Sequence, residues 1–121
     1  MSQTSNSKQY DLEKRTFEFA RRVRVFVKKL SRFTSNIEDS RQLVRSSGSV
    51  AANYIEANES LSKKDFAMRI KICRKEAKES RLWLRLCDPG VSKDLNKEQL
   101  LLIKEAEELT KIFGSIVEKC K

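Results

Sequence analysis

Lysine and arginine outnumber aspartate and glutamate by 26 to 17 in this chain of 121 residues, giving a net charge of +9. Guanidinium and ammonium groups bind phosphates through salt-dependent contacts that carry little sequence information. The excess therefore indicates a polyanion as a partner, although a basic total is also compatible with a solvated surface.

Side chains that could carry out catalysis are scarce. The chain has no histidine, and no nucleophile is paired with a base. A di-iron bundle would need histidines beside its carboxylates, which rules out that chemistry for Glu76, Glu79, Glu107 and Glu108. The sequence therefore predicts no enzyme, no metal and no cofactor.

Three cysteines, Cys73, Cys87 and Cys120, have no C-x-x-C spacing. An odd number without that spacing favours reduced thiols and a cytoplasmic protein. The longest apolar run, Leu100 to Ile103, is too short to span a membrane. Residues 1–9 lack the apolar segment of a signal peptide and are expected to form a disordered tail, followed by one domain over residues 10–121.

Apolar residues recur along the chain at alternating spacings of three and four, which places the charged residues and the cysteines on helices. With only three glycines and one proline, the chain cannot supply the turns of a β-sandwich or barrel. The spacing predicts helices over residues 10–34, 36–58, 62–87 and 96–120. Their similar lengths and short connections favour an all-α fold, an antiparallel up-down-up-down four-helix bundle.

Polar and apolar pairs mark the expected helix ends. Three starts are predicted by capping pairs, namely Asn36 with Asp39, Ser62 with Asp65, and Asn96 with Gln99. Leu61 is expected to pack on Phe66, and Leu95 on Leu100, as hydrophobic staples. Residues 88–90, Asp-Pro-Gly, end the third helix. Cys73 and Cys87 fall on the apolar face of that helix and Cys120 on that of the fourth, so all three are expected in the core.

The segment from Ser46 to Ser60 is unusually rich in Gly, Ala and Ser. One glycine without a preceding strand does not make a phosphate-binding loop. These small residues either let neighbouring helices approach closely or form a second contact surface against another subunit. For that interface the candidate residues are Ser49, Ala52, Asn53, Tyr54, Glu56 and Trp83.

Residues 42–86 resemble a bacterial four-helix-bundle family first known from reading frames inside intervening sequences of 23S ribosomal RNA genes. The matching positions are Arg45, the small residues 46–52, Asn53 with Glu56, Lys64 with Phe66, Glu76, Glu79, Trp83 and Leu84. Ala51 and Ala57 depart from the proline and glycine often found there. The resemblance implies a cytoplasmic homopentamer without catalytic residues. A related family member, the accessory protein of diversity-generating retroelements, binds nucleic acid.

Basic residues are concentrated on two of the expected helices. Residues 11–33 hold eight Lys/Arg and three acids, and residues 63–87 hold nine and three. These helices are diagonal in an up-down-up-down square, so their charge cannot form one flat side but can collect at one end. With cuts at about residues 20, 47, 73 and 106, one end holds sixteen Lys/Arg against eight acids and the other ten against nine. The candidate phosphate-binding residues are Arg21, Arg22, Arg24, Lys28, Lys29, Arg32, Arg74, Lys75, Lys78, Arg81 and Arg85.

Two functions remain open at this point. The first is a non-catalytic RNA- or DNA-binding accessory protein that assembles as a homo-oligomer. The alternative is a protein-interaction scaffold whose basic charge is incidental. No RNA-recognition motif with stacking aromatics is present, so the sequence does not predict readout of particular bases.

Overall fold

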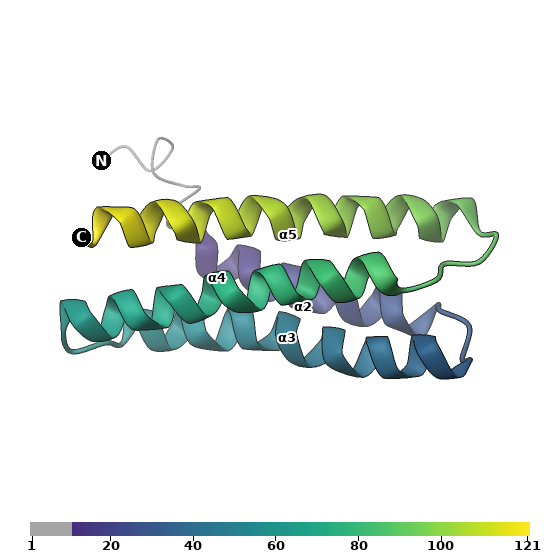
Figure 1. The fold of residues 1–121 in the computed structure, drawn as a ribbon, viewed down its shortest axis with the longest axis horizontal. Coiled ribbons are helices and arrows are strands. Elements are labelled where there is room, and N and C mark those ends of the chain that lie inside the picture. The colour runs from purple at the N-terminus through teal and green to yellow at the C-terminus, as the bar shows by residue number, and fades with distance from the viewer. Residues whose placement is uncertain (1–10) are drawn as a thin grey trace.

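Four helices make up the computed structural model, which describes residues 11–121. They are α2 (Leu12–Lys28), α3 (Thr34–Asn58), α4 (Lys63–Leu86) and α5 (Lys93–Lys119). Each helix runs antiparallel to the next in the chain (Figure 1). Consecutive helices pack together and α2 also packs on α5, whereas the described backbones of α2 and α4 do not approach each other closely, as expected for diagonal helices. The predicted all-α, up-down-up-down four-helix bundle is confirmed.

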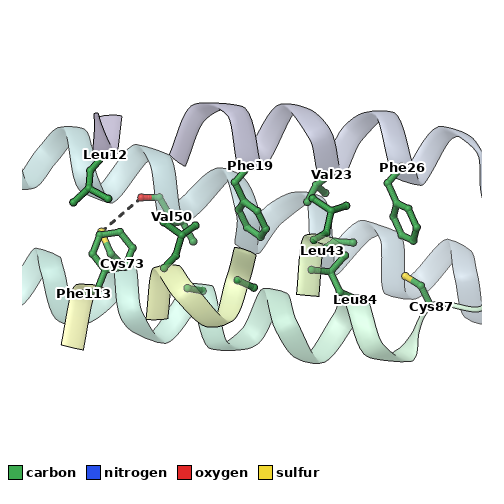
Figure 2. Packing of buried hydrophobic residues seen from close by; sticks show 14 of the residues in the cluster. Leu12, Phe19, Val23, Phe26, Leu43, Val50, Cys73, Leu84, Cys87 and Phe113 are labelled. Carbon is green, nitrogen blue, oxygen red and sulfur yellow. Dashed lines mark hydrogen bonds between the residues drawn. The ribbon is translucent and has the colours of Figure 1, made fainter. Parts of the chain in front are cut away.

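The core consists of the residues that recur at three-and-four spacing on each helix. Phe19, Val23 and Phe26 of α2 are fully buried against the other helices (Figure 2). Leu12, the first residue of α2, lies level with Cys73 of α4 and Phe113 of α5. Helix α2 therefore covers only part of the length of the bundle, from the level of Cys73 and Phe113 to the end where the α4–α5 connection lies.

Helix starts agree with the sequence at α4 and differ at two other helices. Ser62 caps α4, since its hydroxyl accepts from the Asp65 amide at 3.0 Å. Helix α5 starts earlier than predicted, at Lys93, because Ser92 caps it by accepting from the Leu95 amide at 3.1 Å. Asn96 is therefore not a cap. Asn36 is not one either, because α3 already begins at Thr34 and the Asn36 side chain is buried.

Several smaller expectations are also wrong. Helix α2 ends at Lys28 rather than near residue 34. Leu61 and Leu100 are 98% and 58% exposed, so neither acts as part of a hydrophobic staple. Cys120 is exposed because the core at this end stops at Val117.

The connection between α4 and α5 turns as predicted, at Pro89 and Gly90. Gly90 has a φ of +69°, a conformation that side chains with a Cβ rarely adopt. The predicted tail over residues 1–9 lies outside the described residues. No helix of the described chain is long and apolar enough to cross a membrane.

Candidate nucleic-acid interface

The eleven candidate cationic residues lie on two surfaces at opposite corners of the bundle. The α2 surface comprises Arg21, Arg22, Arg24, Lys28, Lys29 and Arg32. The α4 surface comprises Arg74, Lys75, Lys78, Arg81 and Arg85, and the structure adds Lys71 to it. Since α2 and α4 are diagonal helices whose described backbones do not approach each other closely, their outward sides face away from each other.

Helical periodicity explains why these side chains point outward. Burial of Phe19, Val23 and Phe26 fixes the orientation of α2, which leaves Arg21, Arg24 and Lys28 on its solvent side. At 1.5 Å per residue, the cations from Arg21 to Lys28 extend for about 10 Å along α2, and those from Arg74 to Arg85 for about 16 Å along α4. The charge therefore follows the sides of two helices as well as approaching one end.

Because α2 begins at the level of Cys73 and Phe113, the charge balance between the two ends of the bundle differs from the one expected from the sequence. A division through Leu12, Val50, Cys73 and Phe113 replaces the sequence-based cut at residue 20. The part leading to the α4–α5 connection, residues 12–50 and 73–113, then holds nineteen Lys/Arg against twelve acids. That part also contains most of the chain, so the positive excess is distributed along two surfaces and not concentrated at a tip.

Ion pairs within the bundle neutralise some of the α2 surface. Arg21 lies 2.8 Å from the Glu18 carboxylate, and Arg22 lies 3.3 Å from that of Glu98 on α5. The remaining members have no carboxylate partner within 4.0 Å among the described residues, namely Arg24, Lys28, Lys29 and Arg32. These four cations are available to an external anion.

Arg24 is held in place by its surroundings. Its Nη1 donates to the Ala20 carbonyl at 2.9 Å. Its Nη2 lies 3.2 Å from the position that a Cβ on Gly48 would occupy. The glycine in the small-residue segment of α3 thus makes room for the Arg24 guanidinium, which contributes to the fixed geometry of the α2 surface.

The α4 surface contains a hollow of about 420 Å³. It is lined by Lys71, Arg74, Lys75, Lys78, Glu79 and Leu82. The carboxylate of Glu79 already accepts from Arg45 Nη2 at 2.9 Å. Four cations therefore line this hollow, and the one carboxylate among the lining residues is already paired, which suits an anionic ligand.

Other charges of α4 are paired with carboxylates of the bundle. Arg81 Nε donates to Glu107 at 2.6 Å, and Lys75 lies 3.9 Å from buried Glu76. Arg45 also lies 3.4 Å from Glu76, so this residue of the family motif balances the acids of α4. Sequence reasoning missed Lys71 because the charge division was placed at residue 73.

The small residues serve mainly to bring helices together. Ser46 and Ser80 are fully buried and their hydroxyls are hydrogen-bonded at 2.8 Å across the α3–α4 seam. Farther along α3, Ser49 is half-buried and Ala52 is exposed. The latter pair, together with half-buried Ala51, remains partly available for contact with another subunit.

The other interface candidates occupy different environments. Asn53 Nδ2 donates to Ser49 Oγ, and Asn53 Oδ1 accepts from Arg69 Nη1, both at 3.0 Å. Tyr54 packs its ring on that of Phe113, with centroids 6.1 Å apart. Glu56 is exposed. Trp83 is half-buried, and its Nε1 is a buried donor without an acceptor among the described residues.

Two of the three thiols are inert core groups, as predicted. Cys73 and Cys87 are buried, and burial raises the pKa of each thiol to about 12. The Cys73 thiol also donates to the Val50 carbonyl at 3.6 Å (Figure 2). The described residues contain no cluster of three or more potential His, Cys, Asp or Glu metal ligands.

Together the fold and its surfaces define a small four-helix bundle with cationic sides. Residues 8–115 match the family of 23S rRNA-intervening sequence proteins, and the chain belongs to that family. It is similar to a Bacteroides thetaiotaomicron protein of unknown function from the S23 ribosomal protein family. The two are 28% identical over 88% of this chain and 97% of that one, with a TM-score of 0.73. No curated protein matches the chain.

Proposed function

We propose that this chain is a non-catalytic accessory protein that binds the phosphates of RNA or DNA through its α2 and α4 surfaces. The observation that carries the proposal is the set of outward cations without carboxylate partners in the described chain. It includes Arg24 and Lys28 on α2, and Arg74, Lys78 and Arg85 on α4. Such groups bind phosphates with strong salt dependence and little sequence preference.

The test compares two sets of charge-neutralising substitutions. The first set changes Arg24, Lys28, Lys78 and Arg85 to Gln, and omits Arg81 because Glu107 would lose its partner. The control set changes four other exposed lysines to Gln, namely Lys63, Lys64, Lys111 and Lys119. Binding of labelled RNA and duplex DNA is measured at 50 and 200 mM salt, and circular dichroism monitors the fold.

The wild type is expected to lose about a hundredfold in affinity between the two salt concentrations if four or more phosphates are contacted. The first set should abolish most binding, and the control set should retain it. Equal losses from both sets would contradict binding by defined surfaces. Absence of binding at the lower salt concentration would favour the protein-interaction scaffold.

The proposal includes assembly as a homo-oligomer in the cytoplasm, with the five copies that the family resemblance implies. Its support is the partial exposure of Ser49, the exposure of Ala52 and the buried Trp83 Nε1, which lacks an acceptor within the described chain. Buried donors without a partner are uncommon in proteins. The free thiols are consistent with a reducing compartment. Light scattering that gives the mass of a monomer at micromolar concentration would overturn the assembly.

A further inference from the structure

The two most exposed aromatic side chains of the described chain both lie beside the α2 surface. Phe17 is 58% exposed and Phe33 is 46% exposed. Phe17 precedes Arg21 by one helical turn, and Phe33 directly follows Arg32. The exposed large apolar residues of α4 are aliphatic, namely Met68, Leu82 and Leu86.

The position of Phe17 is not explained by packing within the bundle. Phe19 is 1% exposed, and two residues along a helix correspond to a rotation of about 200°. Phe17 is therefore on the opposite side of α2 from Phe19 and outside the buried stripe. A single exposed apolar residue is ordinary in soluble proteins, so the informative feature is the set of side chains around it.

Phe17 is part of an outward row with an alternating spacing of three and four. The other members of this row are Lys14, Arg21, Arg24 and Lys28. All of them are exposed, and residues at this spacing lie along one side of a helix. One aromatic ring is thus placed between a lysine on one side and two arginines and a lysine on the other.

An aromatic ring within a row of cations has the chemistry that recognises single-stranded nucleic acid. Unpaired bases stack on aromatic faces while cations follow the phosphates, and every base can stack, so this binding tolerates many sequences. Bases inside a duplex are already stacked and do not offer their faces to a side chain. The α4 surface has cations and exposed aliphatic residues, but its one aromatic residue, Trp83, is half-buried.

From this arrangement we infer that the α2 surface binds a single-stranded segment of RNA or DNA. This inference rests on the proposed phosphate-binding function. Phe17 stacks on an unpaired base, and Arg24 and Lys28 contact the phosphates that follow it. Phe33, at the far end of the cationic segment, provides a second stacking position. Arg24 is already oriented for this role by the Ala20 carbonyl.

The experiment measures fluorescence anisotropy with three labelled probes of equal length. They are a single strand, the matching duplex, and a strand of abasic sites, with ribose and deoxyribose versions distinguishing RNA from DNA. The single strand is expected to bind most tightly.

Phe17→Ala should weaken binding of the single strand by about 5- to 150-fold, the factor associated with one stacked base. The same change should leave binding of the duplex and of the abasic strand within about twofold, and Phe17→Trp should preserve single-strand affinity.

Leu100→Ala is the matched control, because Leu100 is also 58% exposed but lies on α5. It should leave all three affinities unchanged. Equal affinity for the single strand and duplex, with no effect of Phe17→Ala, would overturn this inference while leaving the phosphate-binding function intact. Failure of all three probes to bind would overturn both.

Discussion

Two polar residues, Asn36 and Gln99, join chain segments that are distant in the sequence. Asn36 Nδ2 donates to the carbonyls of Ser31 and Asp88, at 3.1 and 3.0 Å. Its Oδ1 accepts from the Asp88 amide at 2.9 Å. Gln99 Nε2 donates to the carbonyls of Leu84 and Cys87, both at 2.8 Å, and so satisfies the end of α4. Both residues therefore hold the end of the bundle from which the α4–α5 connection leaves.

Replacement of Asn36 by Ala is expected to lower the free energy of unfolding by about 1–3 kcal/mol, because it leaves polar backbone groups without partners. Asn96→Ala provides the comparison, since Asn96 is exposed on α5, and should change stability by about 0.5 kcal/mol or less. Urea denaturation followed by circular dichroism measures both. A similar effect of the two substitutions would mean that the contacts of Asn36 contribute nothing specific.

At the scale of the element, α3 is a helix whose small residues have different environments on different sides. Ser46 lies against α4, where its hydroxyl meets that of Ser80. Gly48 lies against the Arg24 guanidinium of α2. Ser49 is half-buried and Ala52 is exposed to solvent. One segment of sequence thus provides close packing on two sides and leaves a third side open to another subunit.

Substitution by Leu distinguishes these sides of α3. Ser46→Leu should destabilise the single bundle by about 1–3 kcal/mol, because the seam has no space for a larger side chain. Ser49→Leu should leave the midpoint of unfolding of the dilute protein nearly unchanged and should weaken self-association. Denaturation and sedimentation of both variants test this pair of outcomes. The assembly proposed for this side of α3 requires that Ser49→Leu change the sedimentation behaviour.

At the scale of the whole molecule, two cationic surfaces stand at diagonal corners of the bundle. The α2·α3, α3·α4, α4·α5 and α2·α5 contacts form a closed square in the described chain. Cations on α2 and α4 are therefore separated by the core, so under the proposed function each surface would contact its own phosphates. Two independent surfaces should make additive contributions to binding.

Additivity is tested through the dependence of duplex affinity on salt. One variant changes three cations of the α2 surface to Gln, namely Arg24, Lys28 and Lys29. A second changes three cations of the α4 surface, namely Arg74, Lys78 and Arg85. Each should reduce the slope of log affinity against log salt by up to about 3, at about 0.9 per lost phosphate contact, and the combined variant by the sum. If the variant with both sets of changes has the same salt slope as either single-surface variant, the proposal of two separate binding surfaces is wrong.

The sequence by itself determined the four helices, most of the buried residues, the Ser62 cap and the burial of Cys73 and Cys87. These features follow from local chemistry, because the spacing of apolar residues and the capping pairs act within one or two helical turns. The family resemblance is likewise carried by the residue types and spacing of residues 42–86 alone.

Only the tertiary structure decided the roles of Asn36 and Gln99, the exposure of Cys120 and the level at which α2 begins. It also decided which cations are free, since Arg22 is paired with Glu98 and Arg81 with Glu107, 76 and 26 residues away. A polar side chain that reaches a distant carbonyl looks, in sequence, like a helix cap, and a cation looks the same whether or not another helix supplies its counterion. Their partners are set by the packing of the helices, which no local pattern records.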